Sequence, residues 1–237
     1  MSDTAAGCGN SPGYGRRDSV PMKESQLKDN GLKENLHGAF IVLDGPDGCG
    51  KSTQLRLLTD WLNDNDVETA GFRDPGGTTI GEQIRTILLS PAHDAMDTRT
   101  ELLLYMAARA QLWREKIAPS LEGGRCVVLD RWLSSTCAYQ GYAGGFGLDA
   151  VVAMAEDCLE RAWPDLTVVL DIDTQAAMGR LDRRLDRMEA KGREYHGRVR
   201  QGFLELASRR KDFIVVDAAR GIERVHEEVL ACIRKCF

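Results

Sequence analysis

Five short apolar runs divide the chain into a regular pattern from residue 39 onwards. They are AFIVLD (39–44), VETAGFR (67–73), RCVVLD (125–130), LTVVLDI (166–172) and DFIVVD (212–217), and longer amphipathic segments separate them. Near-continuous apolar strands are typical of a parallel sheet covered on both faces, with helices supplying the crossovers. The pattern predicts an α/β fold, a doubly wound five-stranded parallel sheet with helices on both faces.

The segment between the second and third runs carries signals for the two ends of a helix. Thr98 and Glu101 form a capping-box pattern before LLLYMAARAQLWREKIAPSL, and Gly123-Gly124 predicts where that helix ends. Residues 1–36, by contrast, are rich in polar residues and glycine and show no sustained hydrophobic period. We therefore expect a disordered polar leader over residues 1–36 and one folded domain over residues 37–237.

Composition excludes several classes of protein. The chain has 237 residues and a formal net charge of −5, so it lacks the basic surplus of a nucleic-acid-binding protein. No apolar run approaches the roughly 18 residues that span a bilayer, and the N-terminal segment lacks the apolar core of a secretion signal. The 7 cysteines form no CxxC pair and the 4 histidines lack metal-ligand spacing, which argues against a zinc site. We expect a cytoplasmic protein without nucleic-acid or membrane partners.

Residues 45–52, GPDGCGKS, contain the phosphate-binding pattern G-x-x-x-x-G-K-[ST]. The motif directly follows the first apolar run and directly precedes the helical pattern STQLRLLTDWLN, which is the context it requires. Its glycines let backbone N–H groups face phosphate oxygens, and the helix N-terminus adds positive potential. We expect Lys51 to contact the β- and γ-phosphates of a nucleoside triphosphate and Ser52 to coordinate Mg²⁺. The expected nucleotide-binding residues are Gly45, Pro46, Asp47, Gly48, Cys49, Gly50, Lys51, Ser52 and Thr53.

Four of the predicted strands end in aspartate: Asp44, Asp130, Asp171 and Asp217. Asp171 and Asp217 are interpreted as helix caps or loop residues. Asp130 differs because Arg131 follows it, at the edge of the sheet where such folds bind ligands. Asp130 is predicted to belong to the Mg²⁺ shell and Arg131 to grip a phosphate, with a structural ion pair as the alternative.

Further arginines favour an acceptor that carries a phosphate. Arg73, Arg85 and Arg109 lie in segments that flank the predicted strand ends, and residues 180–200 are dense in arginine. Transfer of a phosphoryl group depends mainly on positioning and charge neutralisation, and a phosphate acceptor needs no strong general base. A nucleoside kinase would need a base near a sugar hydroxyl, and the set of arginines argues against it.

From about Ala39 to the C-terminus the chain resembles the bacterial thymidylate kinases, which are P-loop nucleoside monophosphate kinases. The matching segments are GPDGCGKSTQ, FRDPGGTTIGEQIRTILL, ELLLYMAARAQ, IAPSLEGGRCVVLDRW, SSTCAYQG, PDLTVVLD, DRME and FLELA. The resemblance implies ATP-dependent phosphorylation of dTMP to dTDP with Mg²⁺, by an enzyme whose relatives are usually homodimers. One departure is Asp74, where the family motif more often has glutamate.

The resemblance also assigns roles to individual residues. Asp47, an acid inside a loop that binds anions, matches the residue that binds the 3′-hydroxyl of the acceptor sugar. Tyr105 matches the aromatic residue that stacks on thymine, Arg109 the one that donates to the base O4, and Thr136 a polar residue near N3. The remaining matches are Tyr139 against the sugar, Arg85 and Arg131 on the acceptor phosphate, and Ser135 and Gln140 as supporting residues.

The resemblance further implies a short arginine-rich lid over residues 178–200. Some members of the family carry a basic residue inside the phosphate loop, where this chain has Gly48, and members without it supply an arginine from the lid. Arg183 and Arg184 are predicted to stabilise the transferring charge, with Arg187 next, and Arg180 to stack on adenine. A solvated helix with paired charges remains the alternative for this segment.

Other functions for the same motifs remain open at this point. A P-loop switch or binding module would use the same nucleotide site, although the guanine-reading N-K-x-D motif is absent. A kinase for another nucleotide or nucleoside, or an inactive paralogue, is also compatible with the phosphate loop. The role of residues 1–36, the discrimination of thymine from uracil, any redox role of Cys49 and the oligomeric state are not determined by the sequence.

Overall fold

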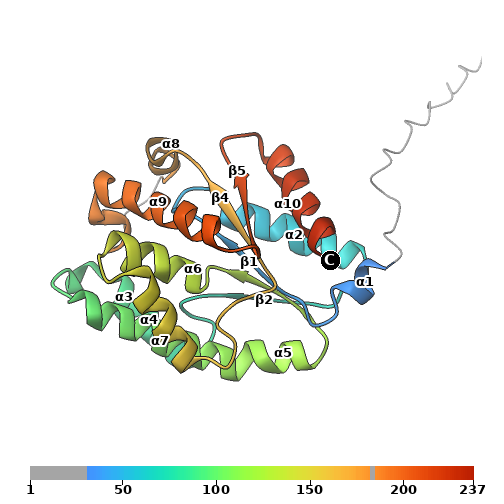
Figure 1. Cartoon of the computed structure of the whole chain (residues 1–237), viewed down its shortest axis with the longest axis horizontal. Helices are drawn as coiled ribbons and strands as arrows, with labels where there is room; N and C mark the ends of the chain where they lie inside the picture. Colours follow the sequence, from blue (N-terminus) through green and yellow to red (C-terminus); the bar gives the residue numbers. More distant parts are fainter. Residues whose placement is uncertain (1–30, 182–184) are drawn as a thin grey trace, which may run out of the picture.

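The computed structural model describes residues 31–181 and 185–237. In these residues five strands form one parallel sheet in the order β2-β3-β1-β4-β5 (Figure 1). Each strand lies within the apolar run that predicted it, so the five-stranded parallel sheet is confirmed. The strands are β1 (Phe40–Asp44), β2 (Thr69–Arg73), β3 (Cys126–Asp130), β4 (Leu166–Asp171) and β5 (Phe213–Asp217).

Successive residues of the central strand pack into two different cores. Phe40 and Val42 belong to one buried cluster, and Ile41 and Leu43 belong to the other. Both faces of a parallel sheet are covered in this way, which is why the strand reads as an unbroken apolar run. Full burial of each such side chain contributes about 2 kcal/mol.

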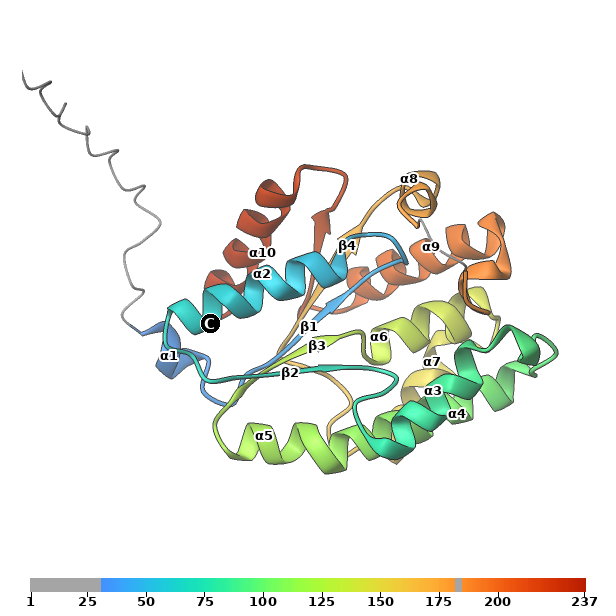
Figure 2. The same cartoon turned by 180° about the vertical axis from the view of Figure 1, so that it is seen from behind.

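Helices cover both faces of the sheet, as predicted. One face packs against α2 (Lys51–Asp64) and α10 (Ile222–Cys236), and the other packs against α4 (Thr98–Leu112), α7 (Leu148–Cys158) and α9 (Arg193–Arg209) (Figures 1 and 2). The remaining helices are short or lie nearer the edge. They are α1 (Leu32–Asn35), α3 (Thr79–Leu89), α5 (Ala118–Glu122), α6 (Leu133–Thr136) and α8 (Thr174–Gly179), with 3-10 turns at Pro91–His93 and Glu189–Lys191.

The order of the strands places the phosphate loop at the centre of one edge. β1 pairs with β3 on one side and with β4 on the other, all parallel. The chain therefore leaves β1 toward β2 and β3 and later returns to the opposite side for β4 and β5. The carboxyl end of β1 lies where the direction of winding reverses, the position at which open α/β sheets bind ligands.

The folded part begins earlier than residue 37, the boundary expected from composition. Residues 32–35 form α1, and both Leu32 and Leu36 are buried in the cluster that contains Ile41 and the apolar face of α2. For residues 32–36 the prediction of a disordered leader was therefore wrong. Two leucines in a polar segment give no periodic signal, yet they are enough to cover the end of this core. Residues 1–30 lie outside the described residues.

The helix predicted after Thr98 starts with a different cap. The side chain of Asp97, not Thr98, accepts the backbone N–H of Arg99 at 2.9 Å, and Glu101 is buried instead of capping. Asp97 precedes the helix by one residue and its carboxylate is an effective N-cap. The helical path continues through a π-helical segment, Trp113–Ile117, and ends at Glu122 before Gly123, as the glycine pair predicted.

Candidate active site

A cavity of about 700 Å³ opens at the carboxyl edge of the sheet. Its wall combines the phosphate loop after β1, the segment after β2, the ends of β3 and α8, and the start of α10. Most of the residues that the sequence assigned to nucleotides meet here. They are Asp47, Gly48, Cys49, Gly50, Lys51, Ser52, Thr53, Arg85, Tyr105, Arg109, Asp130, Arg131, Ser135, Thr136, Tyr139, Gln140 and Arg180.

Two further residues of the phosphate loop, Gly45 and Pro46, lie beneath the cavity wall. Both are buried, and their carbonyl oxygens accept hydrogen bonds from the Lys51 ammonium at 3.0 and 2.8 Å. Gly45 has φ +136, and a Cβ there would lie 2.4 Å from the Leu170 carbonyl oxygen. The loop therefore sits directly on the end of β4, and its first glycine is required by both conformation and contact.

Asp44, the last residue of β1, anchors the phosphate loop to α6, the short helix that follows β3. Its buried carboxylate accepts hydrogen bonds from the Gly45 N–H at 2.8 Å and from the hydroxyls of Ser134 and Ser135 at 2.5 and 2.7 Å. A buried carboxylate is stable only when its oxygens are satisfied in this way. The sequence reading assigned no role to Asp44 or Ser134. A structural role for Asp44 could have been predicted, because Asp44 directly precedes the phosphate-loop motif.

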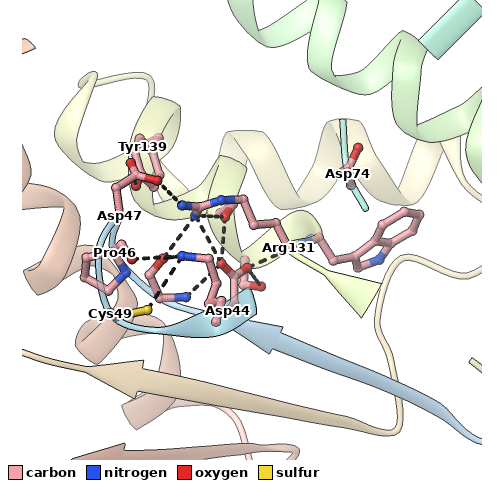
Figure 3. A network of polar contacts seen from close by, with 12 residues as sticks. Asp44, Pro46, Asp47, Cys49, Asp74, Arg131 and Tyr139 are labelled. Carbon is pink, nitrogen blue, oxygen red and sulfur yellow. Dashed lines mark hydrogen bonds and ion pairs between the residues drawn. The ribbon is translucent and has the colours of Figure 1, made fainter. Parts of the chain in front are cut away.

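Asp47 links the phosphate loop to Arg131 and Tyr139 (Figure 3). One carboxylate oxygen pairs with the Arg131 guanidinium, and the other accepts the Tyr139 hydroxyl at 2.7 Å. Burial by itself raises the pKa of Asp47, but the charges of Arg131 and Lys51 and the Tyr139 hydroxyl outweigh it and hold that pKa well below its ordinary value. Asp47 is therefore a permanent anion at physiological pH.

Arg131 is held in place by several groups besides Asp47. Its Nη1 donates to the Gly45 carbonyl at 3.0 Å and to the Ser135 hydroxyl at 2.9 Å. Burial opposes its charge, but Asp47, followed by Tyr139 and Asp44, raises the pKa of Arg131 well above the ordinary range. Its backbone has φ +65, the left-handed region that non-glycine residues rarely adopt. This strained strand end aims the guanidinium at the cavity wall.

Arg109 and Asp74 form a buried ion pair at another part of the cavity. Arg109 donates from Nε at 2.8 Å and from Nη2 at 2.5 Å to the same oxygen of Asp74, and Nη2 also donates to the Thr136 hydroxyl at 2.8 Å. Both side chains are 1% exposed. Burial raises the pKa of Asp74 against the opposing charge of Arg109. The contact of Asp74, undetermined from the sequence, is thus with the predicted base-reading arginine.

Arg85 lies near other positive charges and beside the same segment. Its Nη1 donates to the Pro75 carbonyl at 2.9 Å. Burial lowers the pKa of Arg85, and the nearby charges of Arg73 and Arg131 lower it further. A concentration of positive charge that depresses an arginine pKa attracts an anion. Arg73 itself is not part of the cavity wall and pairs with Glu82 at 2.9 Å.

Gln140 and Tyr139 lie on a π-helical segment, Cys137–Ala143, that follows α6. The Gln140 amide donates to Glu101 at 2.7 Å, and Glu101 also pairs with Arg187 at 2.6 Å and with Lys191 at 3.1 Å. Arg187 is buried and donates to the Leu88 carbonyl at 2.7 Å. Arg187 therefore anchors part of the expected lid, residues 178–200, to α3 and α4 and does not line the cavity. Its role as a third lid arginine stays a prediction, and in this structure Glu101 and the Leu88 carbonyl hold its guanidinium inside the protein.

The cavity also has an end with apolar lining. Arg180 lies beside Ala218, to whose carbonyl it donates at 3.3 Å, and Ile222 and Val225 at the start of α10 complete this end.

The two arginines predicted to act in transfer, Arg183 and Arg184, lie outside the described residues. Asp74 and Glu101 were not predicted as site residues, because a buried acid paired with a cation becomes recognisable only when segments distant in sequence are brought together.

Comparison with known proteins agrees with this geometry. The sequence model of the family described as Thymidylate kinase matches residues 43–229. The chain is 42% identical to a thymidylate kinase of Exiguobacterium sp. over 198 residues, 82% of this chain and 93% of that protein. It is 41% identical to one of Halothermothrix orenii over 207 residues, covering 85% and 99% of the two chains, and 39% identical to one of Clostridium novyi over 197 residues, covering 81% and 96%. These matches show that this chain belongs to the thymidylate kinase family.

Proposed function

We propose that the protein transfers the γ-phosphoryl group of ATP to dTMP and releases ADP and dTDP. The observation that carries this proposal, beside the family, is the position of Asp47. It lies within the phosphate loop but its carboxylate contacts Arg131 and Tyr139, residues that belong to the predicted acceptor side. A carboxylate in that position accepts a hydrogen bond from a sugar hydroxyl placed between two nucleotides.

The two nucleotides are assigned to two ends of the cavity. ATP lies with its phosphates on the loop and on the N-terminus of α2, Lys51 contacts the β- and γ-phosphates, and adenine lies near Arg180. The acceptor phosphate lies between Arg85 and Arg131, and the sugar lies against Tyr139. Thymine lies between Tyr105, Arg109 and Thr136, with Ser135 and Gln140 as supporting residues. Catalysis here consists of positioning and charge neutralisation, because phosphoryl transfer to a phosphate requires little covalent help.

Asp130 and Ser52 fit a magnesium ion that accompanies ATP. The Asp130 Oδ1 atom is buried without a hydrogen-bond partner in the described part of the chain, and both residues line the cavity beside the phosphate loop. A single carboxylate and a hydroxyl are typical protein ligands of Mg²⁺ when phosphates supply the remaining oxygens. Bound there, the ion neutralises charge on the β- and γ-phosphates.

The packing of Gly48 supports the lid, and not the phosphate loop, as the source of the arginine that stabilises the transferring phosphoryl group. Gly48 has φ +78, and a Cβ there would lie 2.1 Å from the Ala177 carbonyl oxygen. No side chain, basic or otherwise, fits at this loop position without movement of α8. Arg183 and Arg184 follow α8 by a few residues and are the proposed stabilisers of the transferring phosphoryl group. Replacing both with alanine is expected to lower kcat by about a thousandfold while KM changes little.

The test is an ADP-release assay with Mg-ATP and each of dTMP, dUMP, dCMP, dGMP, dAMP, UMP and AMP, beside a control without acceptor. ADP formed mainly with dTMP, and largely lost in Asp47→Ala, supports the kinase and the role of Asp47. ADP released equally without acceptor identifies an NTPase and removes the acceptor assignments. Product identity is checked by separating dTDP from dTMP on an anion-exchange column.

We further infer a cytoplasmic homodimer. Ile80, Ile87 and Leu103 on α3 and α4 are 51%, 42% and 57% exposed, and α3 packs on α4. Exposed large apolar side chains on two helices that pack together are typical of a protein–protein interface. No helix in residues 31–181 or 185–237 is long and apolar enough to cross a bilayer. Sedimentation of the wild type against Leu103→Lys tests the dimer, and a monomeric wild type contradicts it.

A further inference from the structure

Two buried acids, Asp74 and Glu101, each bind one of two polar side chains that face the proposed thymine position. Asp74 directly follows β2 and Glu101 lies on α4, and they are 2% and 1% exposed. Neither contacts the phosphate loop through its side chain; their partners are Arg109 and Gln140, which line the cavity. The two partners differ in chemistry, because a guanidinium only donates hydrogen bonds whereas an amide can donate or accept.

Asp74 accepts hydrogen bonds from two nitrogens on one side of the Arg109 guanidinium. Nε and Nη2 donate to Asp74 Oδ2, and Nη2 also contacts the Trp132 carbonyl at 3.3 Å and the Thr136 hydroxyl at 2.8 Å. The partner found for Nη1 is the weakly accepting Sδ atom of Met106 at 3.5 Å. The strong acceptors therefore all lie around Nε and Nη2, and Nη1 is the donor that remains for a ligand in the cavity.

Glu101 fixes which end of the Gln140 amide faces the cavity. Gln140 donates from Nε2 to Glu101 Oε1 at 2.7 Å. Glu101 also accepts from Arg187 and Lys191, two cations that require an anion at this position. A carboxylate accepts but does not donate, so the amide cannot turn over without losing this bond. The Oε1 atom of Gln140 is therefore turned away from Glu101 and remains as an acceptor.

We propose that Asp74 and Glu101 are positioning residues that set the hydrogen-bonding polarity of the base site, Asp74 by presenting Arg109 as a donor and Glu101 by presenting Gln140 as an acceptor. This inference rests on the proposed function. A donor beside an acceptor complements thymine or uracil, whose O4 accepts and whose N3–H donates. It opposes cytosine, whose N4 amino group donates and whose N3 accepts. Thymine is thus distinguished from cytosine by two acids that act through Arg109 and Gln140.

The first variant is Glu101→Gln, which can donate as well as accept and so lets the Gln140 amide turn over. The ratio of kcat/KM for dTMP to that for dCMP is expected to fall about tenfold or more, through a higher KM for dTMP and measurable turnover of dCMP. Lys191→Gln is the matched control, since it removes one cation from Glu101 but keeps the Glu101–Gln140 bond. Its ratio is expected to stay at the wild-type value.

The second variant is Asp74→Asn, which weakens the bond that orients Arg109. KM for dTMP is expected to rise about tenfold, with a smaller change in kcat and a smaller preference over dCMP. Asp74→Glu restores a carboxylate and is expected to recover most of the preference. Asp60→Asn, in an exposed pair with Arg56, is the control for loss of an acid elsewhere.

Circular dichroism first confirms that each variant is folded. Calorimetric titration then measures the affinities for dTMP, dUMP and dCMP, which give the preference among the bases independently of catalysis. Loss of the preference over dCMP in either carboxylate variant, with both controls unchanged, supports the inference. An unchanged ratio in the folded variants overturns it, and so does an equal loss of affinity for all three nucleotides. A wild type that makes no dTDP contradicts the proposed function instead, and binding preferences still decide the role of the two acids.

Discussion

The two ends of the cavity are built by different means. At the phosphate end, the site is formed by backbone groups of one continuous segment. Glycine conformations at Gly45 and Gly48 bring that segment against Leu170 and Ala177. At the acceptor end, side chains from β2, α3, α4, β3 and the π-helical segment converge, and buried acids hold them. Asp47 belongs to the first region by sequence and to the second by its contacts.

This difference determines which substitutions damage each end of the cavity. The phosphate end depends on conformations that glycine alone adopts without strain, and on a small number of close backbone contacts. The acceptor end depends on ion pairs, where loss of one partner leaves a buried charge and is more harmful than loss of both. A substitution can therefore impair one region and leave the other intact.

Lys51→Met removes the charge of the phosphate end and keeps a similar side-chain length. Activity is expected to fall by a factor of about 10² to 10³ or more, since charge stabilisation at the transferring phosphate is lost. Affinity for dTMP, measured by calorimetry, is expected to change little, because the acceptor residues lie elsewhere. Loss of dTMP binding in this variant contradicts the separation of the two ends.

Asp47→Asn acts on the residue shared by both regions. We expect kcat/KM for dTMP to fall about a hundredfold and the free energy of unfolding to fall by about 2 kcal/mol at pH 7, because Arg131 loses its charged partner. Because its folded-state pKa is depressed, Asp47 contributes stability fully above its ordinary pKa of 3.8, and this is lost as pH falls through the lower, folded-state value. Urea unfolding at pH 7, 5 and 3 measures this. A difference between wild type and variant that instead disappears between pH 7 and 5 would falsify the ionisation assigned to Asp47.

Gly48→Ala and Gly145→Ala form a matched pair for the phosphate end. Both glycines have φ +78, but a Cβ at Gly145 meets nothing within 4 Å whereas one at Gly48 meets Ala177. Conformational strain of about 1–3 kcal/mol is common to both. We expect Gly48→Ala to lose more stability in thermal unfolding, and to bind ATP more weakly, because α8 must move. Equal losses in the two variants show that the contact with Ala177 does not matter.

Tyr139→Phe removes one hydroxyl and keeps the ring that is proposed to lie against the sugar. The bond to Asp47 is lost, with an expected cost of about 1 kcal/mol in stability and a reduction of kcat/KM for dTMP of about fivefold. Turnover of UMP is expected to remain low, because the ring still occupies the position of a 2′-hydroxyl. A large gain with UMP assigns the discrimination to the hydroxyl group instead of the ring.

The sheet was predictable because its signals are local. Each apolar run predicted one strand, although only the inner strands β1, β3 and β4 are buried on both faces and the edge strands β2 and β5 are partly exposed. The phosphate-loop motif was recognisable from the spacing of Gly45, Gly50, Lys51 and Ser52. Errors occurred where two signals competed over one or two residues. Asp97 replaced Thr98 as the cap of α4, and Leu32 and Leu36 joined a core from within a polar segment.

The acceptor end became predictable only in part, by resemblance to a family. Arg85, Arg109, Thr136, Tyr139 and Gln140 were named from matching motifs, and they all line the cavity. Their orientations were not predictable, since these depend on Asp44, Asp74, Glu101 and Ser134, which no motif singled out.

The sequence by itself determined the fold class, the phosphate loop and the set of side chains available to a second nucleotide, because periodicity and contiguous motifs depend on neighbours along the chain. Tertiary structure alone decided that Asp74 holds Arg109 from 35 residues away and that Glu101 holds Gln140 from 39 residues away. It also decided that Arg187 is buried and does not line the cavity. The strength of a buried ion pair depends on burial and on distance in space, and neither is encoded at any single position of the chain.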